Sequence, residues 1–440
     1  MKKYQLLLLI LFIITIVLPI EVATVLTFFS LILFVNKVYR IRAWKGSKGI
    51  VLPIVLLLLL GCISGFNSIN GKDYLRDIFL VVKILIFFIS GVVLCSRINN
   101  ISDFYKCLRT AAVIMALIHL GKIAANGFNF SLSINQFRED LGRGSTIEFI
   151  YVALFISRIT SRQFNRLFLK ITNIDRILFL LVFISFCLYF SRTMFINAFL
   201  IVSFLKFKLN IRNVFSKRNR SIIALVFLGF ITFFSLRTIA SYEAQNSFLS
   251  QFVSKLDNIT NELVWTSKEN TDATLADINT NWRGYEAFRG MQKYLDGSNI
   301  QKVIGFGWGS LVDLGMQQEL DGKYYEEIPV LHNGYVMLLV KTGVVGLLLY
   351  LIFLFRLGFG KFDTPTISNK WGNNVGVYVS RLLSSFCIIE LVSTLTVTGL
   401  LNKNDFLIVV LMGWCWGVRL FPNIGRFKLL IIEDVSKNYI

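Results

Sequence analysis

Long apolar segments recur along the whole chain, separated by short charged stretches. A bilayer core about 30 Å thick requires roughly 20 apolar residues per helix, and shorter helices are tolerated inside a bundle. Measured by that length, the sequence predicts about 12 spans. They lie near residues 4–19, 22–38, 50–66, 78–95, 110–125, 147–160, 177–190, 193–207, 221–238, 331–355, 375–397 and 405–420. A mean hydropathy of +0.64 excludes an ordinary soluble fold, and we expect an all-α polytopic membrane protein.

The distribution of charge predicts the orientation of these spans. The net charge is +20, and Lys and Arg concentrate in the loops after every second apolar segment. These loops are Lys37 to Lys48, Arg97 to Arg109, Arg158 to Arg176, Lys206 to Arg220, Arg356 to Lys370 and the tail from Arg419. This is the positive-inside pattern of a bilayer protein, which accounts for the charge without nucleic acid and places both termini in the cytoplasm. Residues 240–330 hold 7 basic and 13 acidic residues, and we expect this acidic segment to lie outside.

Three regions follow from this pattern. Residues 1–239 are expected to carry transmembrane helices 1 to 9, residues 240–330 a large periplasmic loop, and residues 331–440 helices 10 to 12 and a cytoplasmic tail. The basic start and first apolar run resemble a signal peptide, but no small-residue cleavage site follows, so we interpret them as the first span. A single helix over 177–207 would place the two flanking basic loops on opposite sides of the membrane. We therefore expect two short helices with Arg192 at their outer turn.

Within the acidic segment, one stretch has the spacing of an amphipathic helix. From Arg283 to Leu295, apolar residues recur every three to four positions, which predicts a helix on the membrane surface or capping the bundle. Glu286 is three residues from both Arg283 and Arg289 and is expected to pair with one of them. The following run Gly305 to Gly309 is too rich in glycine for a regular element.

Two residue types stand out as candidates for chemistry. His332 lies where the acidic segment re-enters the membrane, and an imidazole there can accept a proton from a hydroxyl, although a polar interfacial anchor explains it equally well. The other histidine, His119, lies mid-span and is interpreted as a satisfied core residue. Arg192 suits either a clamp for an anionic group such as phosphate or snorkelling to the headgroups. Arg138 and Arg143 are candidates for a further phosphate contact, with solvated loop charge as the alternative.

Other ionisable residues and several absences narrow the function further. Charged residues near or within spans are expected to snorkel or to pair inside the bundle: Lys83, Arg237, Lys341, Arg381 and Glu390. All six cysteines fall in or beside apolar segments, which argues against a disulfide framework. The acidic segment has no metal-ligand cluster and no Ser/His/Asp set, and the sequence has no phosphate-binding glycine loop. We expect neither a metal nor a cofactor.

With these residues in place, the chain resembles the superfamily of bacterial O-antigen polymerases and O-antigen ligases. The resemblance rests on the motif Tyr189 to Thr193, the motif Asn281 to Ala287, the turn Gly305 to Gly309, and His332-Asn333 followed by Gly343 and Gly346. These motifs cover roughly residues 180–355, and the first 150 residues agree only in hydropathy. The resemblance implies that His332, Arg192 and Arg283 are catalytic. It also implies substrate-binding roles for Arg289, Arg138, Arg143, Asn333 and Tyr335.

The resemblance also implies a reaction. Such proteins take an undecaprenyl-pyrophosphate-linked oligosaccharide as donor at the periplasmic face of the inner membrane and transfer it to a sugar hydroxyl with inversion. Arginines stabilise the departing pyrophosphate, a role suited to fixed cations, and the histidine orients or deprotonates the hydroxyl. The expected partners are the lipid-linked glycan, membrane lipids and a polysaccharide chain-length regulator, and the expected product is O-antigen or capsular polysaccharide.

Two other functions remain open on the sequence. A ligase passes the finished glycan to lipid A core, and the motifs do not separate it from the polymerase, which we favour. A lipid-linked oligosaccharide flippase belongs to a different class. About 12 spans and intramembrane charges such as Arg381 and Glu390 suit it, whereas the single long outer loop and the lack of halfway symmetry do not.

Overall fold

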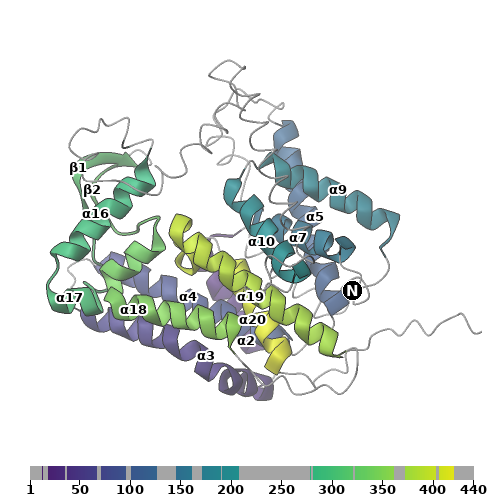
Figure 1. Ribbon diagram of the computed structural model, residues 1–440, viewed down its shortest axis with the longest axis horizontal. Helices are drawn as coiled ribbons and strands as arrows, with labels where there is room; N and C mark the ends of the chain where they lie inside the picture. The colour runs from purple at the N-terminus through teal and green to yellow at the C-terminus, as the bar shows by residue number, and fades with distance from the viewer. Residues whose placement is uncertain are drawn as a thin grey trace, which may run out of the picture.

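The protein is largely helical, with one small β-hairpin (Figure 1). The computed structural model describes residues 12, 18–34, 37–66, 71–95, 101–125, 145–160, 171–189, 191–207, 278, 281–320, 323–360, 372–402 and 406–420. The expected span 221–238 lies outside these residues, as do most of span 4–19 and nearly all of residues 240–280.

The described helices occupy the positions of the other ten predicted spans. Those in the first half of the chain are α2 (Ile20–Phe34), α3 (Lys37–Ser64), α4 (Gly71–Cys95), α5 (Ile101–Ala125), α7 (Ser145–Thr160), α9 (Asn173–Leu188) and α10 (Arg192–Phe207). Those in the second half are α18 (Gly334–Phe359), α19 (Gly372–Val397) and α20 (Phe406–Leu420). The run 177–207 thus forms two helices, as predicted, with Arg192 as the first residue of α10.

Five of the described helices are long and apolar enough to cross a membrane, which indicates a membrane-embedded protein. They are Lys45–Ser64, Gly71–Cys95, Ile101–Ala125, Gly334–Phe359 and Val375–Val397. Several helices begin earlier than their apolar windows. α4 starts at Gly71 rather than near residue 78, and α5 at Ile101 rather than near residue 110, because charged residues continue the helix beyond its apolar part.

The helices form two groups joined by α19. Helices α3, α4, α18 and α20 pack together with α2, while α5, α7 and α9 pack with one another and α10 packs on α7 (Figure 1). α19 contacts α18 and α20 on one side and α10 on the other. The closest approach is between α4 and α20, where a Cβ on Gly91 would lie 2.1 Å from the Val410 carbonyl oxygen, and one on Gly413 2.0 Å from that of Phe88. Small residues permit such contact between membrane helices.

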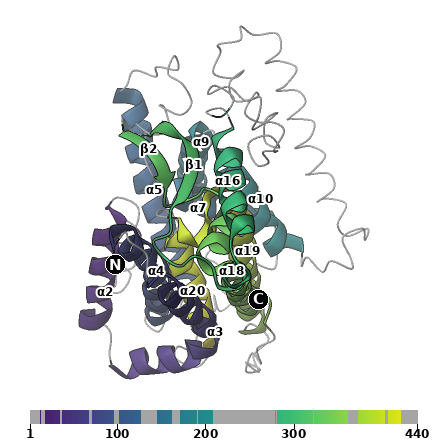
Figure 2. The same ribbon diagram turned by 90° about the vertical axis from the view of Figure 1, so that its left-hand side faces the viewer.

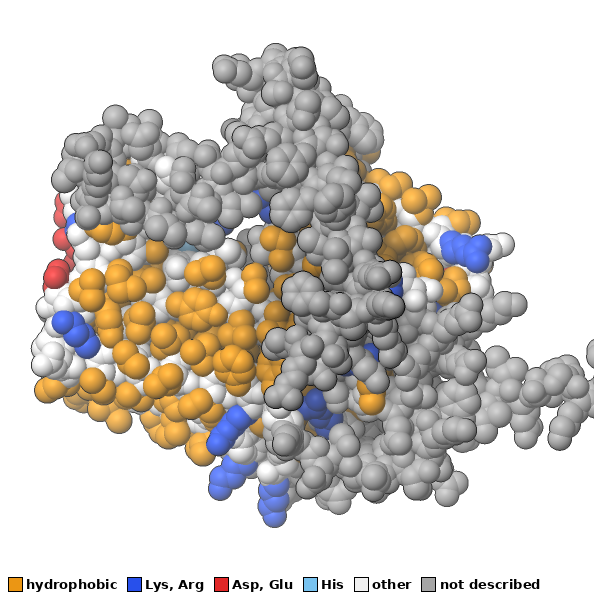
Figure 3. Space-filling view, viewed as in Figure 1, with side chains coloured by type: hydrophobic (Ala, Val, Ile, Leu, Met, Phe, Trp, Pro, Cys, Tyr) orange, Lys and Arg blue, Asp and Glu red, His pale blue; other side chains and the backbone are white. Residues whose placement is uncertain are grey.

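Apolar side chains cover the outside of this bundle. The exposed apolar residues of α18 lie along one stripe at helical spacing: Val344, Val345, Leu348, Ile352, Phe355 and Phe359. Figure 3 shows a continuous hydrophobic face, with acidic side chains visible only at one edge. In water such a face would be costly, and in a bilayer it is solvated by lipid tails.

Residues 281–328, which precede α18, form a compact unit at one end of the helix bundle. This unit and the helix ends beside it are called the loop end below. The unit contains α16 (Trp282–Asp296), α17 (Asn299–Ile304) and an antiparallel hairpin of β1 (Val312–Leu320) and β2 (Lys323–Ile328) (Figure 2). The helix predicted over 283–295 is confirmed, whereas the hairpin was not predicted, since only amphipathic helices were expected in this segment.

Candidate functional site

A carboxylate–imidazole pair lies at the loop end, where the chain enters α18. His332 Nδ1 lies 2.6 Å from Glu286 Oε2, and the His332 backbone N–H donates to the same oxygen at 3.1 Å. The Glu286 side chain is 3% exposed and that of His332 is 44% exposed. A buried acceptor on Nδ1 favours the tautomer that leaves Nε2 unprotonated and accessible, which is the arrangement of a general base.

The face that α16 buries explains how Glu286 reaches the histidine. Gly284, Tyr285, Glu286, Ala287 and Gly290 are buried, and the backbone approaches closely because two of these residues are glycines. A Cβ on Gly290 would lie 2.6 Å from the Leu331 side chain. The hydrophobic spacing predicted the helix and most of its packed face: Tyr285 is buried, and Phe288 and Met291 pack against the core, whereas Leu295 at the end of the helix is 58% exposed.

The hairpin holds α16 from the other side. The Tyr285 hydroxyl donates to the Leu314 carbonyl oxygen, and Arg289 Nε donates to the Asp313 carbonyl oxygen at 3.0 Å. Arg289 Nη2 also lies 3.6 Å from Asp313 Oδ2. The Arg289 side chain is therefore engaged by β1, and its predicted contact with substrate stays a prediction.

The structure corrects the predicted partner of Glu286. The sequence favoured an ion pair with Arg283 or Arg289 on the same helix, but the carboxylate bonds to His332. The reason is that Glu286 lies on the buried face of α16, which packs against the residues just before α18. Arg289 instead points toward the hairpin and contacts β1. Arg283 is partly exposed in the first turn of α16 and makes no hydrogen bond or ion pair with any residue that the structure describes.

The residues after His332 fix the start of α18. Asn333 is its N-cap, and its side-chain oxygen accepts from the backbone N–H groups of Tyr335 and Val336 at 3.1 and 3.2 Å. The Tyr335 hydroxyl donates to the Leu391 carbonyl oxygen at 2.7 Å, and the Thr398 N–H donates to the His332 carbonyl oxygen at 2.8 Å. Asn333 and Tyr335 thus support the site, and their predicted contact with substrate is untested.

Contacts between helices place Arg192 at the loop end. The Tyr189 hydroxyl, where α9 ends, donates at 3.4 Å to Glu148 near the start of α7, so α7 and α10 start at the same end. In α19, Arg381 Nη1 donates at 3.0 Å to the carbonyl oxygen of Leu205, near the end of α10. α19 therefore runs antiparallel to α10, and its last residues lie toward the end of α10 that carries Arg192.

A buried polar cluster supports the turn that carries Arg192. The His119 ring stacks on Tyr189 with centroids 3.8 Å apart and an interplanar angle of 11°, and His119 Nδ1 lies 2.8 Å from Ser185 Oγ. His119 is buried, as predicted for a core residue, but it is only partly satisfied, because its Nε2 has no hydrogen-bond partner among the described residues. Three helices, α5, α7 and α9, meet at this cluster, and its Tyr189 lies three residues before Arg192.

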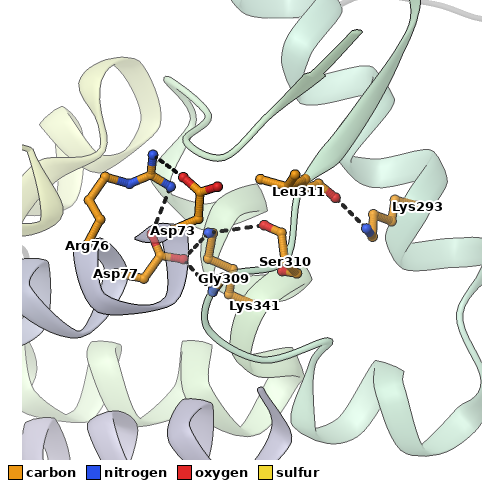
Figure 4. Close-up of polar contacts among 8 residues, drawn as sticks. All are labelled: Asp73, Arg76, Asp77, Lys293, Gly309, Ser310, Leu311 and Lys341. Atoms are coloured by element: carbon orange, nitrogen blue, oxygen red, sulfur yellow. Dashed lines mark hydrogen bonds and ion pairs between the residues drawn. The ribbon is translucent and has the colours of Figure 1, made fainter. Parts of the chain in front are cut away.

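The glycine-rich turn Gly305 to Gly309 anchors the loop end to the bundle. Asp77 of α4 accepts from the Gly309 N–H at 2.8 Å and pairs with the Lys341 ammonium of α18, while Arg76 joins Asp77 to Asp73 (Figure 4). Both Asp77 and Lys341 are buried. The intramembrane Lys341 is thus paired inside the bundle, as predicted, and it ties the turn to two helices.

A break in α18 receives the same turn. Gly343 has a φ of 63° and a ψ of −168°, which interrupts the helix and frees two carbonyl oxygens. The N–H groups of Phe306 and Gly307 donate to the carbonyl oxygens of Val340 and Lys341 at 2.8 and 2.9 Å. Trp308 is buried, and its ring nitrogen donates to the Leu58 carbonyl oxygen of α3 at 3.1 Å.

Lys293 joins α16 to the glycine-rich turn and to the start of the hairpin. The Lys293 ammonium of α16 donates to the Leu311 carbonyl oxygen and lies 5.0 Å from the centroid of the Phe306 ring. Burial lowers its pKa, and the carboxylates of Glu327 and Asp313 oppose that shift. α16, the turn and the hairpin are thus held together as one body.

Three of the predicted residues fall outside the part of the chain that the structure describes. Arg138, Arg143 and Arg237 lie outside the described residues. Among the residues that are described, no three His, Cys, Asp or Glu side chains form a group suited to a metal ion. The site that the structure does bring together is Glu286 with His332, flanked by Arg283 on the same helix as the carboxylate.

No protein-family model matches the sequence, and no curated protein matches it either.

Proposed function

We propose that the protein is an inverting glycosyltransferase that polymerises undecaprenyl-pyrophosphate-linked oligosaccharide repeat units at the periplasmic face of the bacterial inner membrane. The product would be O-antigen or capsular polysaccharide, and the reaction would need neither a metal nor a cofactor. The observation that carries the proposal is the half-exposed imidazole of His332 backed by the buried carboxylate of Glu286. A base oriented in this way suits deprotonation of a sugar hydroxyl.

The proposed reaction is a single displacement. His332 Nε2 takes the proton of the acceptor hydroxyl as its oxygen attacks the anomeric carbon of the donor. The new C–O bond forms while the bond to pyrophosphate breaks, and the electron pair leaves with undecaprenyl pyrophosphate. Glu286 stabilises the imidazolium that results, and the proton then passes to water. Because attack and departure occur on opposite faces of the sugar, the anomeric configuration inverts.

Cations at the same end of the molecule support this scheme. Arg192 and Arg283 are proposed to hold the pyrophosphate and to stabilise the charge that develops as it leaves, which fixed guanidinium groups do well. Arg192 is the first residue of α10, and Arg283 lies in the first turn of α16. Positive helix N-termini add to the attraction for an anion at these two places.

The test uses purified protein in lipid nanodiscs with the lipid-linked repeat unit as sole substrate. A ladder of longer glycans is expected, with activity lost in His332→Ala, Arg192→Ala and Arg283→Ala variants and kept in the surface control Ile300→Ala. If each of the three variants works at the wild-type rate, the assignment is wrong. Product that forms only after lipid A core is added would identify a ligase. In proteoliposomes, movement of the lipid-linked glycan across the bilayer without glycan extension would identify a flippase.

A further inference from the structure

Glu148, in the first turn of α7, carries a fully buried carboxyl group. Its Oε1 accepts from the Tyr189 hydroxyl at 3.4 Å, and the Ser185 hydroxyl also interacts with the carboxyl group. Oε2 is buried and has no hydrogen-bond partner among the residues that the structure describes. Both partners are neutral, so this carboxyl group lies inside a membrane-embedded bundle without a paired charge.

The ionisable groups of the neighbouring helices do not supply that charge. α7 packs against α5, α9 and α10 (Figure 1). His119 of α5 faces Glu148 across Ser185, and Tyr189 faces it from the end of α9. Other groups stand at the same end without pairing with Glu148, or at the far ends of their helices: Arg192 and exposed Lys122 at the same end, and Arg109, Arg158, Asp175 and Lys206 at the far ends.

Burial without a paired charge determines the form in which Glu148 is stable. An unpaired buried carboxylate is costly, and two neutral hydroxyls, one of them at 3.4 Å, compensate for little of that cost. The positive N-terminus of α7 adds only a modest stabilisation. A bound proton removes the charge altogether. A bound Mg²⁺ or Ca²⁺ would need about six oxygen ligands, more than the described groups supply.

The carboxyl group is close to the proposed pyrophosphate clamp. Its partner Tyr189 precedes Arg192 by three residues, which span at most about 11 Å of chain. α10, which begins at Arg192, packs directly on α7. Buried charges are weakly screened, so an ionised Glu148 would attract Arg192 and repel the pyrophosphate of the donor. A protonated Glu148 does neither.

We propose that Glu148 is a proton-binding site and that its bound proton allows Arg192 to hold the pyrophosphate of the donor. The role of Arg192 rests on the proposed function, whereas the proton site does not. The effect is electrostatic and requires no movement of the turn at Tyr189. Removal of the proton at alkaline pH weakens donor binding. Because linked equilibria are reciprocal, a bound donor in turn makes the site hold its proton more tightly.

Infrared spectroscopy tests the proton site without any glycan. A protonated carboxyl group has a C=O stretching band that a carboxylate lacks. In the difference spectrum between wild type and Glu148→Gln, both full-length in nanodiscs, this band should be present at neutral pH and absent at alkaline pH. Glu148→Asp should shift the band rather than remove it. The control Glu21→Gln alters an exposed carboxyl group in the first turn of α2 and should not change the band.

The second measurement is the affinity for the lipid-linked repeat unit at neutral and at alkaline pH. Its pyrophosphate is esterified at both ends, so it neither gains nor loses a proton in this range. Wild type should bind it at least about fivefold more weakly at alkaline pH, because the charge of Glu148 then opposes that of the ligand. Glu148→Gln keeps a neutral side chain and should bind it equally at both. Glu21→Gln should follow wild type.

The outcomes separate the proton site from the proposed function. Absence of the infrared band at neutral pH would overturn the proton site. Equal pH dependence of donor affinity in wild type and Glu148→Gln would overturn its link to donor binding. A requirement of wild type for sodium ions that potassium does not replace would assign the site to a metal ion instead. The infrared band in a protein that binds no donor would support the proton site and refute the proposed function.

Discussion

At the scale of single residues, the orientation of His332 depends on a carboxylate 46 positions earlier in the chain. The sequence identified the histidine because it stands at a membrane re-entry, and it placed Glu286 on the correct helix. The predicted partner of Glu286 was Arg283 or Arg289 on the same helix. That prediction was wrong because residue spacing along one helix gives no information about a partner elsewhere in the chain. The sequence did contain a signal for a buried Glu286, because the carboxylate stands between Tyr285 and Ala287, which are both buried.

The pair gives the first prediction. Glu286→Gln keeps the size of the side chain but removes the charge that stabilises an imidazolium, so the rate of glycan transfer should fall on the order of 10²-fold. Affinity for the lipid-linked donor should change little. Steady-state kinetics in nanodiscs measure both, and Gln292→Ala on the same helix is the control. Unchanged kcat in Glu286→Gln would show that the carboxylate only supports the fold.

A second residue-scale prediction concerns the turn before Arg192. Tyr189→Leu removes the ring that stacks on His119, which should loosen the turn and raise KM for the pyrophosphate-linked donor several-fold. Tyr189→Phe keeps the stack and loses only the hydroxyl, so it should remain near wild type. Donor titrations distinguish the two variants. Equal KM values for Leu and Phe would mean that the stack does not position Arg192.

At the scale of elements, the helices were predictable and the hairpin was missed. The apolar segments predicted the positions of the long helices because each such helix must cross a bilayer of fixed thickness. The predicted starts of α4 and α5 were too late, because charged residues such as Asp73 and Asp103 continue the helix beyond its apolar part. β1 shows alternation only over Val312 to Met316, and its register shifts between Asp313 and Gln318. The dipeptide Asp321-Gly322, a strong signal for a tight hairpin turn, was nevertheless present in the sequence.

The break in α18 gives an element-scale prediction. Gly343→Ala places a Cβ 2.3 Å from the Val303 carbonyl oxygen at a positive φ, so backbone atoms must move and the protein should lose several kcal/mol of stability. Gly121→Ala in α5 meets nothing within 4 Å and should stabilise its helix by about 0.5 to 1 kcal/mol. Thermal unfolding in detergent compares the two. A similar melting temperature for both variants would contradict the role assigned to the break.

At the scale of the whole molecule, the basic and acidic segments predict which way it faces. Lys48, near the start of the apolar part of α3 (Lys45–Ser64), and Ile300 on α17 are both exposed, and we expect them on opposite sides of the membrane. With Cys62 and Cys187 replaced by serine, Ile300→Cys should react with an impermeant maleimide in intact spheroplasts, whereas Lys48→Cys should react only after lysis. Labelling of Lys48→Cys in intact spheroplasts would reverse the proposed orientation.

The docking of the Gly305 to Gly309 turn has a consequence for turnover. The turn is bonded to α3, α4 and α18 by backbone groups and by the Asp77–Lys341 pair, and α16 is bonded to the same unit. In the proposed reaction, the base would therefore stand still while its substrates move. Donors would reach it by sideways diffusion within the bilayer, and after each addition the lengthened glycan would have to shift by one repeat to bring a new hydroxyl to the same imidazole. The rate-limiting step would then be the movement of the lengthened glycan along the protein by one repeat unit. The rate of that step would depend on the length and stiffness of the repeat unit.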